Sequence, residues 1–411
     1  MTRMLRLASL SAAFPATLQL RPVQLVLIVL ALLVIKRSDA AIPPSLCGMV
    51  QEPVRTVWIG TGRNPLSKGI YVCTLNPQNG KLSPPVIAAE ADGPGWVTMH
   101  PNGATLYAGA NVDGKPSIVA YRVIRPEQVT AEQLPQLQFL NSVEVGDGGA
   151  THLNVDATGR MLVSAQYGGG SVAAFALNAD GSLRERTQLV DHEGGSRTVP
   201  GRQDGSHAHW AGFSPDNRFV LVPDLGLDKV VVYSAKPETA TLVANGAGTV
   251  PAGGGPRHMK FDPTGRFAWV LNELSLTITT FAWDADQGTL TPIETVPTVP
   301  DAEKAKEKAV SASEIRVHPS GKFVYSANRG HDTISAFRVD SASGRLSLIE
   351  RENARAATPR NFNLDPSGRW LLVAGQDSHT LGVFEVDQTS GELTWAGSSV
   401  FAPAAICVLI E

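Results

Sequence analysis

The sequence predicts an all-β fold, a seven-bladed β-propeller of four-stranded antiparallel blades. A four-residue turn of the Asp-Pro-Thr-Gly type recurs six times, and the first positions of successive turns lie 47 to 58 residues apart. A hydrophobic strand follows every turn, and another strand follows that one. A period near 50 residues with several strands in each period is typical of a propeller. The turns begin at His100, Asp156, Ser214, Asp262, His318 and Asp365.

The stretch from Gly255 to Phe281 shows the repeating unit most clearly. Arg257 to Phe261 and Phe267 to Leu271 are short apolar or aromatic runs on either side of the turn Asp262-Pro263-Thr264-Gly265. Proline presets φ at the second position of such a turn, and glycine suits its last position. Runs of this kind bounded by Gly and Pro read as strands, and Thr277 to Ala282 supplies the third.

The first blade lacks an innermost strand of its own. Thr56 to Thr61, Ile70 to Leu75 and Pro85 to Ala89 provide three strands, and no further strand precedes them. Ala404 to Ile410 is a hydrophobic strand without a partner after it. We expect this strand to complete the first blade, because ring closure removes open sheet edges.

The other blades should begin near residues 93, 148, 204, 254, 311 and 357. Two connections between them are unusual. Asp191 to Asp204 is a polar, glycine-rich insertion before the fourth blade, and Asp301 to Lys308 is a charged connector of one or two helical turns.

Residues 1–40 have the order of a secretory signal, and residues 41–411 form the expected propeller domain. Three arginines precede the 13-residue apolar run Val23 to Ile35, and small residues at positions 38 and 40 suit cleavage after Ala40. The run is shorter than the roughly 20 residues of a spanning helix. We therefore expect a periplasmic or secreted protein without stable membrane insertion. Lys36-Arg37 leaves an uncleaved N-terminal anchor, or a wrongly assigned start, as the alternative.

Net charge and cysteine content give little further information about partners or disulfides. A net charge of −3 gives no reason to expect nucleic acid as a partner. Cys73 lies in a strand and should be a small core residue. Cys47 and Cys407 lie near the two ends of the mature chain, where they either form a disulfide or remain two buried thiols.

Polar residues gather where a propeller exposes side chains to its central channel. They lie on the predicted innermost strands or directly after the second strands, and loops on a rigid scaffold commonly carry function. The candidate catalytic residues are His209, Arg257, Glu273 and Arg329, and the candidate substrate-binding residues are His207, His258, Glu314, Arg360 and Gln376.

This set suits the attack of water on an ester of an anionic substrate. A His or Glu can accept a proton from water, and arginines can hold an anion and stabilise an oxyanion. Structural roles compete with this hypothesis: Arg257 and Glu273 could form ion pairs between blades, and His209 could be a core histidine beside Trp210. No metal site is predicted, because Ser206-His207-Ala208-His209 lacks a third ligand.

Four stretches resemble blades of the seven-bladed propeller lactonases, a family that includes 6-phosphogluconolactonases of propeller type and fungal 3-carboxymuconate lactonising enzymes. They are GPRHMKFDPTGRFAWVLNELS, SHAHWAGFSPDNRFVLVPDLGLDKV, SEIRVHPSGKFVYSANRGHDTISAFRV and TPRNFNLDPSGRWLLVAGQDSHTLGVFEV. The resemblance covers residues 56 to 411. It implies that the active-site His, Arg, Glu and Arg of the fungal enzymes correspond to His209, Arg257, Glu273 and Arg329, with His207 as an alternative to His209. It also implies that no metal or organic cofactor is needed.

The predicted function is therefore a lactone hydrolase similar to 6-phosphogluconolactonase, acting as a monomer on a small, anionic lactone. The export signal departs from this resemblance, since phosphorylated sugar lactones are not expected outside the cytoplasm. The substrate is then an unphosphorylated or carboxylated lactone, or the chain is a non-catalytic periplasmic propeller that binds a ligand or a partner protein. A metal-dependent gluconolactonase is disfavoured by the missing carboxylate ligands. Whether His209 or Glu273 is the base is left open.

Overall fold

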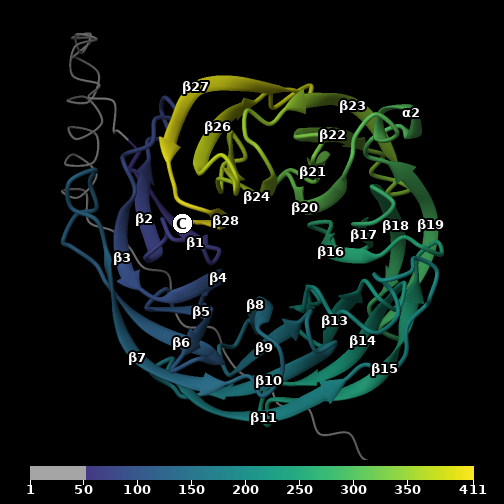
Figure 1. Ribbon diagram of the computed structural model, residues 1–411, viewed down its shortest axis with the longest axis horizontal. Coiled ribbons are helices and arrows are strands. Elements are labelled where there is room, and N and C mark those ends of the chain that lie inside the picture. Colours follow the sequence, from purple (N-terminus) through teal and green to yellow (C-terminus); the bar gives the residue numbers. More distant parts are fainter. Residues whose placement is uncertain (1–51) are drawn as a thin grey trace, which may run out of the picture. The chain divides into compact units, whose positions relative to one another are not determined.

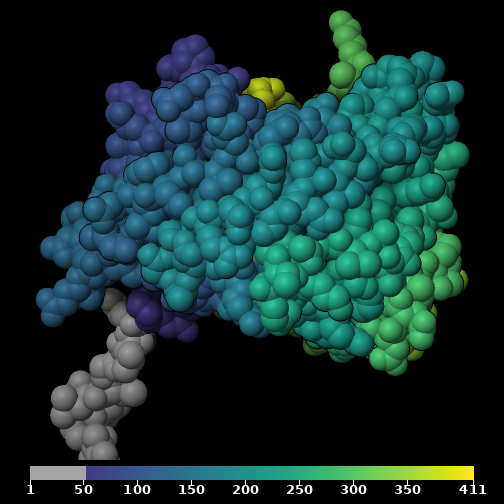
Figure 2. Space-filling view, turned by 90° about the horizontal axis from the view of Figure 1, so that it is seen from below, coloured from purple at the N-terminus to yellow at the C-terminus, as the bar shows by residue number. Residues whose placement is uncertain are grey.

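The computed structural model describes residues 52–411, which form a ring of seven four-stranded antiparallel sheets. The sheets radiate from the centre of the ring, where the innermost strands surround the axis that we call the channel, and the outermost strand of each blade lies on the outer wall (Figure 1). Figure 2 shows this wall, where successive blades follow one another from blue through teal to green. The predicted fold class is confirmed.

The strands of each blade follow the chain from the channel outward, with one exception in the first blade. From innermost to outermost, the first three blades are β28 (Ala405–Ile410), β1 (Arg55–Thr61), β2 (Gly69–Leu75) and β3 (Val86–Glu90); β4 (Asp92–Met99), β5 (Thr105–Val112), β6 (Lys115–Ile124) and β7 (Gln136–Glu144); and β8 (Ala150–Val155), β9 (Met161–Gln166), β10 (Ser171–Leu177) and β11 (Leu183–Asp191). The other four are β12 (Gly212–Phe213), β13 (Phe219–Asp224), β14 (Lys229–Lys236) and β15 (Thr241–Thr249); β16 (Pro256–Phe261), β17 (Phe267–Asn272), β18 (Thr277–Asp284) and β19 (Thr289–Pro297); β20 (Ser311–Val317), β21 (Phe323–Arg329), β22 (Thr333–Val339) and β23 (Leu346–Asn353); and β24 (Pro359–Leu364), β25 (Trp370–Gly375), β26 (Thr380–Val386) and β27 (Leu393–Phe401).

The C-terminal strand closes the ring as predicted. β28 pairs antiparallel with β1, with Val57 opposite Ile410 and Gly60 opposite Cys407. The indole of Trp58 also donates a hydrogen bond of 2.6 Å to the carboxylate of Glu411. The first blade is thus built from two segments far apart in sequence.

The recurring turns join the two inner strands of six blades. Their last position has a positive φ in every blade, for example 72° at Gly265, and Asn217 takes it at 62°. Glycine, and less readily asparagine, tolerates this backbone region, which explains the residue choice. The two turn histidines have a structural role: the His100 and His318 rings bond the turn carbonyls of the next blade, at Gly159 and Gly368.

The core lies between neighbouring blades, where apolar side chains of adjacent sheets pack together. One polar contact recurs there. An aromatic side chain on the second strand donates a hydrogen bond to a backbone carbonyl of the next blade, as Trp269 does to Gly344 at 2.9 Å and Tyr325 to Gly391 at 2.9 Å. These contacts fix the spacing of the blades and hence the channel.

The two unusual connections differ in their role. The charged connector contains one helical turn, α2 (Asp301–Lys304), with no buried residue. The polar insertion between β11 and β12 instead carries a buried glutamine, Gln203, and an arginine that contacts the channel mouth.

The predicted signal, its cleavage site and Cys47 lie outside the described residues. Cys73 and Cys407 are buried thiols. In the part of the chain that the structure describes, no helix is long and apolar enough to cross a membrane.

Candidate active site

The innermost strands share a β-bulge near their first residues. The pairing register of six of these strands with the second strand of the blade shifts there, so that extra residues are left unpaired. Bulges interrupt the ladder and re-aim side chains. Residues in five of the six bulges line the cavities described below, namely Gly95, Thr151, Arg257, Arg360 and Ile406. The bulges thus point side chains into the channel mouth.

Glu273 is the centre of a charged cluster. It follows β17, and its backbone links two blades: its N–H donates to Gly255 and its carbonyl accepts from Ala312. Its Oε2 lies 3.0 Å from Nε of Arg257 and 3.2 Å from Nη2 of Arg329. The side chains of Arg257, Glu273 and Arg329 are 3%, 8% and 15% exposed, so the contacts are shielded from water.

The surroundings of Glu273 decide its charge. Burial by itself raises the pKa of this carboxyl, but the charges of Arg329, Arg257 and Arg202 outweigh burial and lower it below its ordinary value. Burial, with the Arg329 charge, lowers the pKa of Arg257 to about 9. At neutral pH the cluster therefore contains an ionised carboxylate and charged guanidinium groups.

His209 stands beside this cluster as a neutral imidazole. Burial, with the positive charge of Arg257, lowers its pKa well below the ordinary value. Its Nε2 lies 4.0 Å from Oε2 of Glu273, and its buried Nδ1 has no hydrogen-bond partner among the described residues. A neutral imidazole keeps a nitrogen lone pair that can accept a proton.

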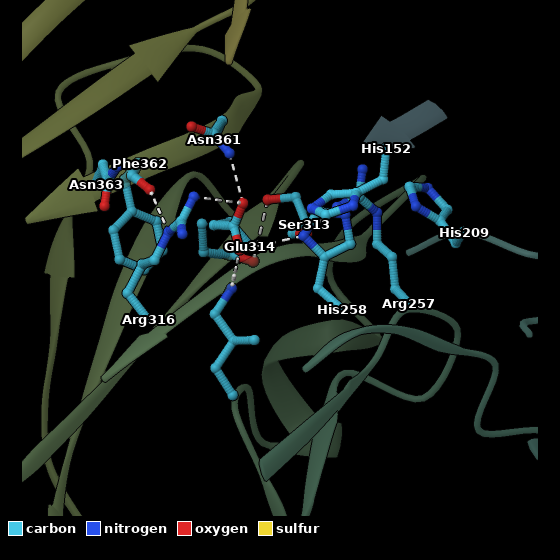
Figure 3. Close-up of polar contacts among 12 residues, drawn as sticks. His152, His209, Arg257, His258, Ser313, Glu314, Arg316, Asn361, Phe362 and Asn363 are labelled. Atoms are coloured by element: carbon cyan, nitrogen blue, oxygen red, sulfur yellow. Dashed lines mark hydrogen bonds and ion pairs between the residues drawn. The ribbon is translucent and has the colours of Figure 1, made fainter. Parts of the chain in front are cut away.

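Three further residues, Ser313, His258 and Glu314, hold Arg257 in place. The Arg257 guanidinium donates to the Ser313 carbonyl, and its Nη1 lies 3.1 Å from Nε2 of His258. The other nitrogen of His258, Nδ1, lies 3.1 Å from Oε1 of Glu314, which is fully buried (Figure 3). Burial, with the Arg257 charge, lowers the pKa of His258 well below its ordinary value. His258 and Glu314 therefore orient Arg257.

Two adjoining cavities open beside these groups. One, of about 240 Å³, is polar and is lined by Thr151, Tyr167, His209, Glu273, Arg329 and Arg360. The other, of about 170 Å³, shares three of these residues and adds apolar walls from Trp96, Ala150 and Ile406. Arg360 lines both cavities and has no hydrogen bond or ion pair to another residue of the described range. Its guanidinium is free to bind an anion.

The structure brings most of the predicted residues together. His209, Arg257, Glu273, Arg329, His258 and Arg360 line the two cavities, and Glu314 contacts His258. Two others stand apart from both linings. The ring of His207 stacks on Tyr167 at 4.5 Å, and Gln376 follows β25 with a buried Oε1 that has no partner among residues 52–411.

Arg202 was missed by sequence reasoning. Its Nη2 lies 2.8 Å from Oε1 of Glu273, on the opposite side of the carboxylate from Arg257 and Arg329. It lies in the insertion, outside the repeating pattern that identified the other candidates. The only signal was the presence of the insertion before the fourth blade. Among residues 52–411, no group of three or more His, Cys, Asp or Glu side chains is placed to hold a metal ion.

Comparisons with known proteins agree with this geometry. The family model for "Lactonase, 7-bladed beta-propeller" matches residues 56–410. The chain is 32% identical to the 6-phosphogluconolactonase of Bacillus subtilis over 303 residues, which cover 74% of this chain and 83% of that protein. The crystal structure of a protein from Lactobacillus plantarum superposes with a TM-score of 0.78 at 30% identity, covering 87% of this chain and 99% of that one. The periplasmic gluconolactonase of Pseudomonas aeruginosa superposes with a TM-score of 0.79 at 32% identity, again over 87% and 99% of the two chains.

Proposed function

Because this chain belongs to the seven-bladed β-propeller lactonase family, we propose that it is a lactone hydrolase that opens its substrate by attack of water. The observation that carries the proposal is the pair formed by neutral His209 and ionised Glu273, 4.0 Å apart at a cavity lined with arginines. A proton acceptor beside donors for a developing negative charge is what ester hydrolysis requires.

His209 is the better candidate for the base. Oε1 of Glu273 contacts Arg202 and Oε2 contacts Arg257 and Arg329, so guanidinium groups already occupy both of its oxygens. His209 is uncharged at neutral pH, and its Nε2 faces the carboxylate. Water attacks the lactone carbonyl carbon while Nε2 of His209 takes the proton. The same proton then passes to the ring oxygen as the ester C–O bond breaks, which yields a hydroxy acid.

The arginines supply the positive charge. As the carbonyl oxygen becomes an oxyanion, the guanidinium groups of Arg257 and Arg329 stabilise it, and removing one such donor typically costs a hundredfold or more in turnover. Glu273, His258 and Glu314 hold these groups in place before the substrate arrives. Arg360 binds the substrate, and we assign supporting roles in binding to His207 and Gln376.

The substrate follows from the size and charge of the site. Two small cavities lined by several guanidinium groups suit a small, anionic lactone ring, with the apolar wall of Trp96 and Ile406 against its less polar face. The names of the relatives specify a phosphorylated or an unphosphorylated sugar lactone. We propose that the protein works as a monomer without a cofactor or a nucleic-acid partner.

The proposed location is the periplasm or the exterior. The order of basic, apolar and small residues in positions 1–40 supports it, and so does the similarity to a periplasmic gluconolactonase. Protein purified from its native host should then begin near Ala41. An intact Met1 on cytosolic protein would overturn this part of the proposal.

A lactone panel tests the function. Purified protein is offered phosphorylated, unphosphorylated and carboxylated lactones, and proton release is followed at constant pH with and without chelator. We expect hydrolysis of at least one lactone above the spontaneous rate, unchanged by chelator. If no lactone is turned over while a lactone or its acid still binds, the protein is instead a ligand-binding propeller.

A further inference from the structure

The insertion between β11 and β12 is a firmly anchored loop, and its position suggests a role beyond connecting two blades. At its start, Nδ1 of His192 lies 2.7 Å from the carboxylate of Asp224, and Nε2 lies 2.8 Å from the hydroxyl of Tyr233. Near its end, buried Gln203 donates to the carbonyl of Leu225 and, at 2.6 Å, to the carboxylate of Asp228. The backbone next to Gln203 is therefore held against the fourth blade.

Arg202 is the neighbour of this anchor and the most exposed arginine of the charged cluster. Its side chain is 41% exposed, against 3% for Arg257 and 15% for Arg329. It reaches two residues of the polar cavity, Oε1 of Glu273 at 2.8 Å and the hydroxyl of Tyr167 at 3.3 Å. Arg202 lines neither cavity itself, but its partly exposed guanidinium contacts two residues that line the polar one.

The contacts of Glu273 are divided between its two oxygens. Oε2 faces the two buried arginines, whereas Oε1 has Arg202 as its partner within residues 52–411. If Arg202 turns away, the carboxylate keeps both deep partners. Because Arg202 is the most exposed of the three arginines, its contact with Glu273 is the most accessible to water and to an entering anion.

We propose that Arg202 is a specificity residue that binds an anionic substituent of the lactone, a phosphate or a carboxylate, at the mouth of the cavity. The substituent replaces Oε1 of Glu273 as the partner of the guanidinium. A planar guanidinium can form two parallel bonds with either anion. The assignment rests on the proposed lactonase function, and it adds the residue that distinguishes charged from uncharged substrates.

A matched pair of lactones tests the assignment, namely glucono-δ-lactone and its 6-phosphate, which differ only in the charged group. A carboxylated lactone, glucaro-1,4-lactone, separates phosphate from carboxylate. Arg202→Gln should lower kcat/KM for the preferred charged lactone by on the order of tenfold, as expected for a lost hydrogen bond to a charged group. The loss should lie mainly in KM, and it should be several times smaller for uncharged gluconolactone.

Arg197→Gln is the control, because Arg197 is an exposed arginine of the same loop with no ion pair to another described residue. It should leave all three substrates unchanged. Arg202→Lys should restore part of the preference for the charged lactone. If Arg202→Gln does not fold, Arg202→Ala replaces it and should show the same loss. An equal loss for charged and uncharged lactones would show that Arg202 only positions Glu273, and no loss for any lactone would also overturn the proposal.

Binding measurements test the role of Arg202 separately from the proposed lactonase function. If the wild type hydrolyses no lactone, the lactonase function fails, and affinity for gluconate and 6-phosphogluconate is then measured by calorimetry. A preference for 6-phosphogluconate over gluconate that Arg202→Gln removes and Arg197→Gln keeps supports the role of Arg202. Equal binding by the wild type and Arg202→Gln contradicts it.

Discussion

Replacing Glu273 by glutamine tests the charged cluster most directly, because glutamine keeps the size and removes the charge. Oε2 of Glu273 lies 3.0 Å from Nε of Arg257 and 3.2 Å from Nη2 of Arg329, both well shielded from water. Removing one partner of a buried ion pair typically costs about 3–5 kcal/mol. Glutamine still offers one acceptor oxygen, so we expect the free energy of unfolding to fall by about 3 kcal/mol, at the lower end of that range.

That loss leaves the protein folded, since domains have about 5–15 kcal/mol of stability. Turnover should fall by about a hundredfold or more, because the guanidinium groups lose the carboxylate that orients them and His209 loses its counter-charge. Urea unfolding measures the first quantity and proton release from the lactone the second. Glu294→Gln is the matched control, since Glu294 pairs with Arg345 at 2.8 Å on the outer strand β19, and it should leave turnover unchanged.

Acid should abolish the difference in stability between the wild type and Glu273→Gln. The pKa of Glu273 is lowered in the folded protein, so its stabilisation is present above the ordinary pKa and is lost as pH falls through the lowered one. The two unfolding free energies should begin to converge as pH falls below the ordinary glutamate pKa of about 4.3, and they should meet once pH is below the lowered pKa. If the variant is destabilised but turns over its lactone at the wild-type rate, the cluster is an ion pair between blades and the catalytic assignment is wrong.

Three further expectations follow from the same contacts. Arg257→Lys should fold yet lose about a hundredfold or more in turnover, since a point charge cannot reproduce the fork of donors; a rate near that of the wild type would contradict the role of Arg257. Burial keeps His152, His209 and His258 neutral by lowering each pKa well below its ordinary value, whereas the unfolded chain protonates them below about pH 6.5. Each should therefore reduce stability by up to about 1.4 kcal/mol per pH unit below that point, and a melting temperature that is constant from pH 7 to pH 5 would refute this. Deleting residues 405–411 should remove the cooperative unfolding transition in calorimetry, because β1 then has an open edge beside the channel.

The repeating pattern predicted most of the fold because each blade carries the same local signals. The turns with their last residue at positive φ set the boundaries, and an unpartnered strand at residues 404–410 indicated how the ring closes. The convergence of His209, Arg257, Glu273 and Arg329 was also predicted, from their places on innermost strands or directly after second strands and from the resemblance to the propeller lactonases.

The sequence was less informative where a residue's role depends on contacts outside the repeat. Arg202 lies in an irregular loop, and nothing in its local sequence shows that it reaches Glu273 in another blade. The bulges could not be predicted, because too few residues lie on either side of an extra residue in a strand of six or seven residues to reveal the break in alternation. The stacking of His207 on Tyr167 depends on a neighbouring second strand, which periodicity cannot place.

The bulges have a consequence for how such proteins diversify. A side chain such as Thr151, Arg360 or Ile406 stands outside the hydrogen-bonded ladder, yet it faces the cavity. A mutation there alters what the cavity accepts while the strands on either side keep their partners. Five of the seven blades therefore each offer a cavity-lining position that can be substituted independently of the strand pairing. A library randomised at these positions should contain many folded members with altered preferences, and it is the natural starting point for engineering new ester hydrolases on this scaffold.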